Sequence, residues 1–378
     1  MKEETLHHWW RSKNVDFRTF ESPIQIIDFG EYNRFENGPD FIGAKIQMND
    51  ILWCGAVEIH INASDWDKHG HQNDNTFNNV ILHVVQHKDK EVYNARNELV
   101  PTIELKPFSK KYNKQHIACE KSLHRVDKLT FINELEHSLI DRLNRKTSLI
   151  DTQQMIYQFD YRAVFTMLLF RSFGNKVNQH FFEQLFVVSY PYLNRATDDL
   201  QVLLFGFAGF ELTNRQREKW EYLKHKFDIR HTTPIQWRTK GFYAGSSPVF
   251  RLKQLSETLK LLHDVDVYQM TVENWVSVRS LIIQQHILSK AQVDLLYINA
   301  VVLFYWWFEK YADDFLFKER AIDLLTELPP EKNNVVNRWK NLGIIPQNAF
   351  DSQALLELTN QKCTFTKCLE CKIGKILL

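Results

Sequence analysis

The chain has 378 residues, which is long enough for two domains of ordinary size. Hydrophobic residues make up 44% of it and charged residues 25%, a balance typical of a globular protein and unlike that of a disordered or fibrous one. The formal net charge of +1 argues against a protein that coats DNA tightly and non-specifically, but not against an enzyme with a local basic cleft.

The N-terminal sequence MKEETLHHWWRSK lacks the apolar stretch that characterises signal peptides. The most hydrophobic segment, LLYINAVVLFYWWF at 295–308, is shorter than the roughly 20 residues that a membrane helix needs, so it predicts a buried helix. Five cysteines in a chain of this length do not indicate a secreted disulfide framework. The sequence therefore favours a cytoplasmic protein without a membrane segment.

About the first 120 residues favour β-strands. Short segments rich in β-branched or aromatic residues are separated there by turn-forming sequences, at 22–33, 41–48, 51–61, 79–87 and 99–105. MNDI at 48–51 fits a tight hairpin turn between the second and third of these strands. The polar sequence between 62 and 78 predicts a loop with a short helix, which Gly70 limits in length.

From about residue 127 onward, apolar residues recur at helical spacing. In LTFINELEHSLIDRL, the side chains of Phe131, Leu135 and Leu139 fall on one face of a helix. The same period predicts further helices at 153–173, 176–189, 197–210, 212–226, 251–263, 272–287, 290–312 and 317–327. We therefore expect an α+β protein, with a small mixed β-sheet domain at 1–120 and an all-helical domain at 121–378.

Two carboxylates interrupt the apolar hairpin pattern, Asp40 at the start of its first strand and Glu58 near the end of its second. Side chains alternate along a strand, so Glu58 and His60 project to the same face. Because antiparallel strands lie about 5 Å apart, Asp40 can approach Glu58 and share a Mg²⁺ or Mn²⁺ ion with it. Such an ion activates water and neutralises phosphoryl oxygens. The alternative is that both acids face solvent.

Pro39-Asp40 followed by Glu58-Ile59-His60 resembles the signature of the PD-(D/E)xK nucleases, whose core also runs strand, strand, helix, strand. The resemblance implies that Asp40 and Glu58 ligate the metal ion with help from the Ile59 carbonyl. His60 then stands where the family usually has lysine. Histidine is the weaker cation at neutral pH, so His60 is expected either to act as a proton shuttle or ligand, or to mark a core that no longer catalyses.

Further candidate ligands follow the hairpin, in SDWDKHGHQND and in the strand NVILHVV: Asp65, His69, His71, Asp74 and His83. A His-x-His sequence near carboxylates can bind Zn²⁺, Mn²⁺ or Fe²⁺. A polar loop of this composition is also typical of a solvated turn, and a histidine within an apolar strand is typical of a hydrogen-bonded core. If the histidines converge with Glu58 and His60, the site favours a transition metal over Mg²⁺.

A broader resemblance spans nearly the whole chain. The motifs NRFENGPDFIGAKI, WCGAVEIHINASDWDKHGH, NNVILHVV, LLFGFAGFEL, VFRLKQL and CTFTKCLECKIG are similar, in this order, to the bacterial family called domain of unknown function 2851, found largely in Bacteroidetes. This resemblance names a family and implies no activity. The chain departs from the family pattern at 242–250, where it reads FYAGSSPVF in place of a sequence closer to RPxNFP.

Cys363, Cys368 and Cys371 are spaced C-x4-C-x2-C close to the C-terminal end of the sequence. Three thiolates can hold a zinc ion or an iron–sulfur cluster with a fourth ligand, for which Cys54, Cys119 and a histidine are candidates. Some PD-(D/E)xK nucleases pair three C-terminal cysteines with a distant one around an iron–sulfur cluster, and the layout resembles theirs. The alternative is reduced cysteines buried as small hydrophobic residues.

Arg251 and Lys253 flank the loop GFYAGSSPVF, where they can either contact phosphates or remain solvated at a helix end. The sequence predicts metal-dependent phosphodiester hydrolysis of nucleic acid, with Asp40 and Glu58 as ligands and His60 assisting the water. One alternative is a non-catalytic nucleic-acid-binding or scaffold protein with a degenerate nuclease core. Another is a histidine-rich metal hydrolase that acts on a different substrate.

Overall fold

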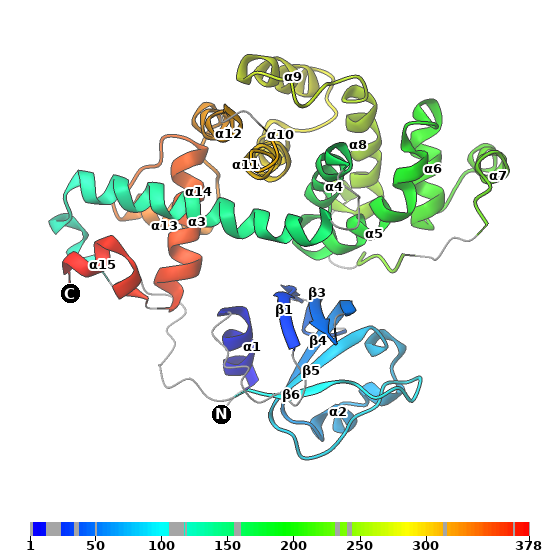
Figure 1. Cartoon of the computed structure of the whole chain (residues 1–378), viewed down its shortest axis with the longest axis horizontal. Helices are drawn as coiled ribbons and strands as arrows, with labels where there is room; N and C mark the ends of the chain where they lie inside the picture. Colours follow the sequence, from blue (N-terminus) through cyan, green and yellow to red (C-terminus); the bar gives the residue numbers. More distant parts are fainter. Residues whose placement is uncertain are drawn as a thin grey trace. The chain divides into compact units, whose positions relative to one another are not determined.

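The computed structural model describes residues 3–12, 24–33, 38–49, 51–105, 117, 119–154, 160–230, 235–239, 244–312, 316–365 and 367–377. The chain divides into two compact units, Met1–Lys114 and Gln115–Leu378. The first contains a β-sheet and the second is mostly helical, as the ribbon in Figure 1 shows, so the predicted α+β class is confirmed. We call these parts the sheet unit and the helical unit.

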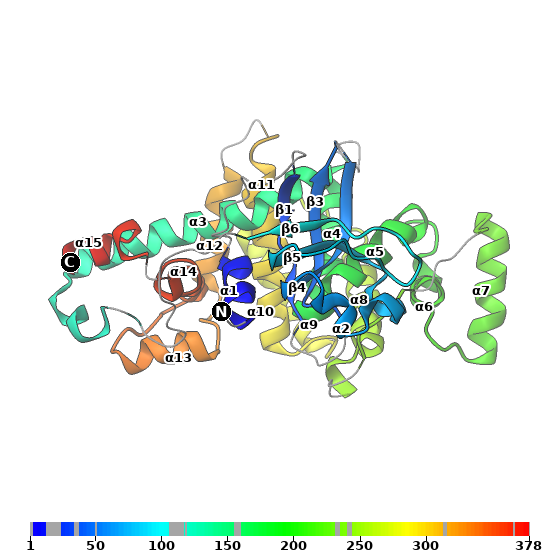
Figure 2. The same cartoon turned by 90° about the horizontal axis from the view of Figure 1, so that it is seen from below.

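The sheet unit is built on a mixed sheet with strands β1 (Ile24–Asp28), β2 (Glu31–Tyr32), β3 (Phe41–Met48), β4 (Ile51–Asn62), β5 (Val80–His87) and β6 (Thr102–Glu104). The strand order is β1-β3-β4-β5-β6, and β2 also pairs with β3; Figure 2 labels β1, β3, β4, β5 and β6, which lie grouped together. Pairing is antiparallel from β1 to β4 and parallel from β4 to β6. The change of direction occurs where the crossover with α2 (Asp65–Lys68) joins β4 to β5.

The turns of the sheet follow from a few backbone positions. Met48 pairs with Ile51, and Asn49 between them has a φ of 48°, which agrees with the tight hairpin turn predicted for MNDI. Gly30, with a φ of 78°, splits the predicted strand at 22–33 into β1 and β2. A Cβ at Gly30 would lie 2.9 Å from the carbonyl oxygen of Ile42, so glycine permits this close approach.

Each face of the sheet has its own apolar cluster. Helix α1 (Glu3–Ser12), which the sequence analysis did not predict, contributes Leu6 and Trp10 to the cluster that contains Val57 and Ile59 of β4. A second apolar cluster surrounds Trp66 and includes strand residues whose side chains point to the opposite face of the sheet. Side chains alternate along a strand, so Glu58 and His60 are directed away from the apolar cluster that contains Val57 and Ile59.

The helical unit is organised around α3 (Lys128–Gln154), against which α11, α14 and α15 pack (Figure 1). Its helices after α3 are α4 (Tyr161–Phe173), α5 (Asn175–Leu193), α6 (Leu200–Ala208), α7 (Asn214–Phe227), α8 (Pro248–Leu261), α9 (Val272–Gln284), α10 (Lys290–Leu296), α11 (Val302–Phe308), α12 (Leu316–Glu327), α13 (Asn334–Asn341), α14 (Ala349–Glu357) and α15 (Lys372–Leu377). The predicted helices are present with shifted ends, whereas α13, α14 and α15 were not predicted.

The most apolar segment of the chain is a core element of the helical unit. α10, a π-helical turn at Tyr297–Val301 and α11 form one continuous stretch, Lys290–Phe308, that is long and apolar enough to cross a membrane. However, 78% of its most apolar window is buried inside the protein. Phe304 and Trp307 are 0% exposed. The prediction of a buried helix at 295–308 is therefore confirmed.

Candidate metal centre

Asp40 and Glu58 meet at one end of the β3–β4 hairpin. The pairing of Phe41 with Val57 places Asp40, the residue before β3, opposite Glu58 on β4. The Asp40 N–H donates to Glu58 Oε2 at 2.9 Å, and the Ile59 N–H donates to Asp40 Oδ2 at 2.9 Å. The two acids therefore lie next to each other, as predicted. The sequence analysis expected the carbonyl of Ile59 to help bind the metal ion, whereas the group of Ile59 that contacts Asp40 here is its N–H.

A bulge in β3 lies next to this pair. Phe41 pairs with Val57 but Ala44 pairs with Gly55, so β3 has one more residue than β4 between the two pairs. Gly43 within this stretch has a φ of 73°, which is typical of a glycine at a bulge. A bulge changes the direction of the neighbouring side chains, and this one follows directly after the end of β3 that adjoins Asp40.

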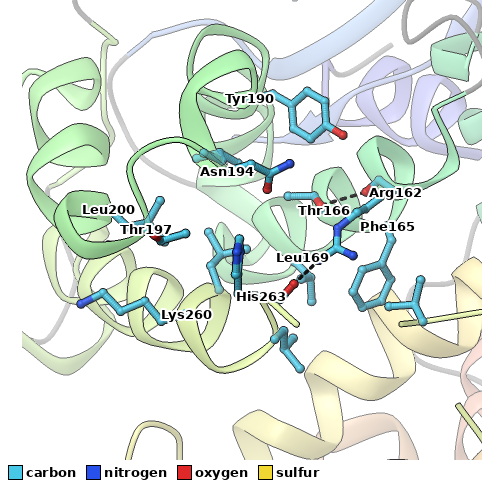
Figure 3. Close-up of a pocket in the computed structure, with 14 residues that line it drawn as sticks. Arg162, Phe165, Thr166, Leu169, Tyr190, Asn194, Thr197, Leu200, Lys260 and His263 are labelled. Atoms are coloured by element: carbon cyan, nitrogen blue, oxygen red, sulfur yellow. Dashed lines mark hydrogen bonds between the residues drawn. The ribbon is translucent and has the colours of Figure 1, made fainter. Parts of the chain in front are cut away.

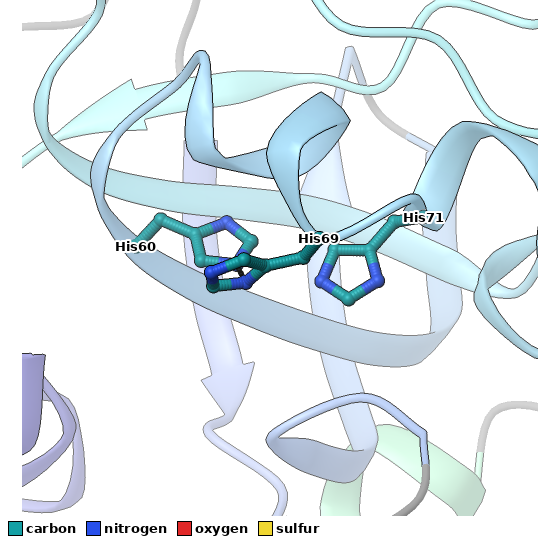
Figure 4. Close-up of side chains that lie close together, drawn as sticks. All are labelled: His60, His69 and His71. Carbon is teal, nitrogen blue, oxygen red and sulfur yellow. Dashed lines mark hydrogen bonds between the residues drawn. The ribbon is translucent and has the colours of Figure 1, made fainter.

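Histidines from β4 and from the crossover after it gather near Glu58. His60 lies two residues further on β4, while His69 and His71 come from the crossover. One ligand atom from each of these imidazoles lies within 4.8 Å of the other two, and Figure 4 shows the three rings grouped together. Glu58 Oε1 is 3.5 Å from His60 Nε2 and 3.3 Å from His71 Nε2. The condition under which the sequence favoured a transition metal, histidines close to Glu58 and His60, is therefore met by His69 and His71.

Helix α1 adds two residues that the sequence analysis missed, Glu3 and His7. Their spacing of four residues places them on one face of the helix, a signal that was available in the sequence. His7 Nε2 lies 3.1 Å from Asp40 Oδ2, and ligand atoms of Glu3, His7 and Asp40 all lie within 4.8 Å of one another. The acid–histidine cluster therefore comprises Glu3, His7, Asp40, Glu58, His60, His69 and His71.

Burial makes the ionised forms of Glu58, His60 and His71 unfavourable. Burial, followed by the charge of Asp40, raises the pKa of Glu58 to about 9. Burial and the neighbouring imidazoles of His83, His71 and His69 lower the pKa of His60 to about 2. The pKa of His71 is also lowered by burial. A divalent cation would reverse the first effect and would use the neutral form of the imidazoles.

Two imidazole nitrogens in the cluster are buried without a hydrogen-bond partner, Nε2 of His7 and Nε2 of His71. Each lies next to a carboxylate oxygen, Asp40 Oδ2 at 3.1 Å and Glu58 Oε1 at 3.3 Å, but not in hydrogen-bonding geometry. Buried polar atoms are rarely left unsatisfied in proteins. A cation between each nitrogen and its neighbouring oxygen would satisfy both, and this combination of donors suits Mn²⁺, Fe²⁺ or Zn²⁺.

A chain of hydrogen bonds sets the tautomer of His60. Thr102 Oγ1 donates its proton to the Val100 carbonyl at 3.0 Å, so it can only accept from His83 Nδ1, which is 3.5 Å away. His83 then carries its proton on Nδ1, and its Nε2 accepts from His60 Nδ1 at 2.9 Å. This tautomer leaves a lone pair on Nε2 of His60. Metal-binding histidines are commonly fixed in this way by a partner at the outer nitrogen.

Nε2 of His60 is directed at the donor atoms of the cluster. It lies 3.5 Å from Glu58 Oε1 and 3.0 Å from His69 Nδ1, which can donate to it. His83 lies on the Nδ1 side of His60. The ring of Trp66 packs against the ring of His83 at a centroid distance of 5.2 Å. The structure thus places His83 as a support for His60 and not among the donor atoms that face Glu58.

Asp65 and Asp74, two of the predicted supporting residues, are engaged locally. Asp65 accepts from the Asn62 N–H at 2.9 Å and from Lys68 Nζ at 2.6 Å. Asp74 accepts from the N–H and the hydroxyl of Thr76, both at 2.8 Å, and caps the short helix at Asn75–Phe77. Short polar side chains often bond to nearby backbone in this way. Neither acid forms a described hydrogen bond or ion pair with the cluster, although the charge of Asp65 acts on His60 and that of Asp74 on His71.

The remaining predicted residues belong to the helical unit. Arg251 on α8 is half-buried, donates to Gln254 Oε1 at 3.3 Å and has an Nε without a described hydrogen-bond partner. Lys253 on the same helix is exposed. Their role in binding phosphate stays a prediction. Cys363, Cys368 and Cys371 also belong to this unit.

A hollow in the helical unit is lined by parts of α4, α5, α6 and α8 (Figure 3). The Arg162 guanidinium in its wall donates to the His263 carbonyl, and Thr166 Oγ1 donates to the Arg162 carbonyl at 2.8 Å. The Tyr190 hydroxyl donates to Asp160 Oδ2 at 2.5 Å. Because these polar groups have partners within the chain, the hollow lacks the unsatisfied donor set that distinguishes the acid–histidine cluster.

Comparison with known proteins gives one family. A family model described as "Protein of unknown function (DUF2851)" matches residues 3–285, which is about three quarters of the chain. The match includes every member of the acid–histidine cluster and stops before the C-terminal cysteines. No curated protein and no solved structure matches the chain.

Proposed function

The chain belongs to the DUF2851 family, whose description assigns no activity, and we propose from the geometry of the sheet unit that it catalyses metal-dependent hydrolysis of phosphodiester bonds in nucleic acid. The observation that carries the proposal is the pair of buried, unpartnered imidazole nitrogens beside the carboxylates of Asp40 and Glu58. Buried groups of this kind are typical of a site that is completed by a cation.

The ligands divide into two groups on either side of Glu58. Oε2 of Glu58 accepts from the Asp40 N–H, on the side of Glu3 and His7, while Oε1 faces His60 and His71. A carboxylate shared between two donor groups suits the paired ions that many phosphodiesterases use. When bound, such ions lower the pKa of the attacking water and neutralise charge on the phosphoryl oxygens.

His60 fits the role of a nitrogen ligand better than the role of a base or of the usual lysine. Its pKa, lowered to about 2 by burial and the neighbouring histidines, makes it neutral and a poor proton acceptor at physiological pH. Its Nε2 carries the lone pair that metal ligation requires. The positive charge that lysine supplies in the nuclease signature would therefore come from the metal, and we expect Mn²⁺ to be preferred to Mg²⁺.

Nucleic acid is proposed as the substrate because Pro39-Asp40 and Glu58-Ile59-His60 resemble the nuclease signature. The order strand, strand, helix, strand that this resemblance implies corresponds to β3, β4, α2 and β5. A second candidate function is nucleic-acid binding without catalysis, which the replacement of the signature lysine by His60 favours. The two candidates differ in whether cleavage accompanies metal binding.

The test compares the wild-type chain with Asp40→Asn and Glu58→Gln in cleavage of labelled DNA and RNA, single- and double-stranded, with Mn²⁺ or Mg²⁺. We expect Mn²⁺-dependent cleavage that falls by at least about 100-fold in both variants, because each removes a charged ligand. Asp74→Asn is the matched control, since asparagine can keep the cap at Thr76 and Asp74 lies outside the cluster.

Cleavage that persists in both variants would overturn the assignment of the catalytic site. Stoichiometric Mn²⁺ binding by calorimetry without cleavage of any substrate would favour the non-catalytic candidate. Absence of binding in the wild-type chain would reject the metal centre itself. Thermal unfolding of each variant in the absence of metal separates these outcomes from a loss of folding.

A further inference from the structure

Helix α7 of the helical unit is strongly basic, although the whole chain is nearly neutral. It contains five lysines and arginines against two glutamates, which gives it a formal charge of +3, compared with +1 for the chain. It packs on α6 and lies at the edge of the helical unit in Figure 1 and in Figure 2. Positive charge that is gathered on one accessible helix attracts polyanions.

The apolar face of α7 fixes the helix in the fold. Its buried residues, which all belong to the large apolar core of the helical unit, are Trp220, Leu223 and Phe227. Trp220 packs so closely on Gly206 of α6 that a Cβ at Gly206 would lie 2.3 Å from the indole ring. A capping box formed by Thr213 and Gln216 begins the helix. The opposite face of α7 is therefore presented to solvent in a defined orientation.

That outer face carries a row of cations with one aromatic ring among them. Its members are spaced four, three and four residues apart, which places them along one face of the helix, and are Arg215, Lys219, Tyr222 and Lys226. We call them the basic stripe. Tyr222 is 54% exposed. The two glutamates of α7, Glu218 and Glu221, lie on the flank of the stripe away from the apolar face.

Two ammonium groups of the stripe lie over the ring of Tyr222. The distance to the ring centroid is 5.2 Å for Lys219 Nζ and 5.9 Å for Lys226 Nζ. Cation–π contacts at exposed positions are weak, so a nucleobase can displace an ammonium group and stack on the ring. The displaced lysine then remains next to the phosphates that flank the base.

Two cations of the stripe are available to an anionic partner. Lys219 pairs with Asp199 Oδ2 at 3.0 Å, whereas Arg215 and Lys226 form no ion pair with any residue that the structure describes. They are about 16 Å apart along the helix axis, and nucleotides of a stacked strand follow at about 3.4 Å, so a few nucleotides reach both. A face that serves only solubility mixes both signs of charge and avoids exposed aromatic rings.

We propose that the basic stripe binds single-stranded nucleic acid, with phosphates at Arg215 and Lys226 and one base stacked on Tyr222. A single strand fits better than a duplex, since only an unpaired base offers its face for stacking. Every base has such a face, so this binding is independent of sequence. Because nucleic acid is taken from the function proposed above, this inference rests on that function and adds the form of the strand and where it binds.

The test is fluorescence anisotropy of short labelled oligonucleotides, single-stranded and duplex, with the full chain in EDTA so that metal-dependent cleavage cannot occur. We expect the single strand to bind more tightly. Tyr222→Leu should weaken its binding by about 10-fold, and Tyr222→Phe should keep it. Arg215→Gln and Lys226→Gln should each reduce the slope of log affinity against log salt concentration by about 0.7, the contribution of one phosphate contact with a single strand.

Lys290→Gln is the matched control, because Lys290 is an exposed lysine at the start of α10 in the same unit, and it should leave the salt slope unchanged. Equal reductions in slope for Lys290→Gln and Lys226→Gln would overturn the placement of the phosphates. Duplex binding as tight as that of the single strand, or unchanged binding by Tyr222→Leu, would overturn the stacking. Circular dichroism shows whether each variant remains folded.

The outcomes for the basic stripe and for the proposed hydrolysis can be told apart. A wild-type chain that binds no oligonucleotide in EDTA but cleaves nucleic acid with Mn²⁺ would overturn the stripe and leave the hydrolytic function. Tyrosine-dependent binding of single strands without any cleavage would support the stripe and contradict the hydrolysis. Asp40→Asn, which lies in the other unit, should bind single strands as the wild-type chain does.

Discussion

In the helical unit the buried carboxylates of Glu134 and Glu357 meet cations of the same chain, whereas the buried carboxylate of Glu58 in the sheet unit meets imidazoles and a backbone N–H. Arg145 donates to both oxygens of Glu357, at 2.8 and 2.6 Å, and Lys362 donates to Glu134. The described contacts of Glu58 include neither lysine nor arginine.

This difference separates a structural ion pair from a candidate binding site. Burial acts to raise the pKa of Glu357, but the hydrogen bond and charge of Arg145 together with Arg142 outweigh it and keep that pKa low. Nothing comparable offsets burial at Glu58, whose pKa rises to about 9. A buried acid paired within the chain contributes to the fold, while a buried acid without a cation supports the proposal that the cation comes from solution.

The largest expected effect is a loss of stability when the buried ion pair of the helical unit is broken. Glu134→Ala leaves the Lys362 ammonium in a buried position without its main partner, so we expect the free energy of unfolding to fall by about 3–5 kcal/mol. Unfolding by denaturant measures this loss of free energy. The control is Asp141→Asn, because Asp141 is 43% exposed and 3.5 Å from Lys362, and should cost less than about 1 kcal/mol. Equal losses in both variants would contradict the distinction.

An intermediate effect is expected from the support behind His60. Thr102→Val removes the hydroxyl that orients His83 and, through it, the tautomer of His60. We expect Mn²⁺ affinity, measured by calorimetry, to weaken by about 10–100-fold, as for other partners of metal-binding histidines. Thr102→Ser keeps the hydroxyl and should restore most of the affinity. If the valine variant binds as tightly as the wild-type chain, Thr102 has no part in positioning His60.

A pH dependence of stability is also expected for the metal-free protein, because two buried groups of the sheet unit have strongly shifted pKa values. The pKa of Glu58 is about 9 in the folded state against 4.5 as its ordinary value, so between these values only the folded state keeps the proton. Stability therefore falls as the pH rises through this window, by at most about 1.4 kcal/mol per pH unit. His60, with a folded pKa of about 2 against 6.5, raises stability with pH only below 6.5.

Thermal unfolding between pH 6.5 and 9 isolates the contribution of Glu58. His7, whose pKa is raised because the neighbouring carboxylate of Asp40 outweighs burial, adds to the fall in the wild-type chain. Glu58→Gln removes the ionisation of Glu58 together with its part in the raised pKa of His7. We expect Glu58→Gln to show a flatter profile, and superimposable profiles would show that Glu58 is ionised in the folded protein throughout this range.

The parts of the candidate site that could be predicted are those set by local chain geometry. The apposition of Asp40 and Glu58 follows from a two-residue hairpin and strand alternation, both visible in the sequence. Asp65 and Asp74 were expected near the site because they are close in sequence, but nearby backbone and side-chain donors hold them. A composition-based prediction cannot distinguish an acid that caps a turn from one that faces a site.

Residues brought in by long-range packing could not be placed in advance. The approach of α1 to the sheet depends on the burial of Leu6 and Trp10, and only that packing brings His7 to Asp40. Likewise, the sequence left Cys54, Cys119 and a histidine as equal candidates for a fourth ligand. Cys119 belongs to the same compact unit as Cys363, whereas Cys54 belongs to the other unit.

By itself the sequence determined the α+β class, the hairpin with its acids and the histidine-rich crossover, because hydrophobic period and turn residues act over a few positions. Tertiary structure alone decided that His7 and His71 keep buried nitrogens without partners and that His83 supports His60. Those features depend on contacts between elements far apart in the chain, where the free energy of burying apolar faces, and no local pattern, sets which polar atoms meet.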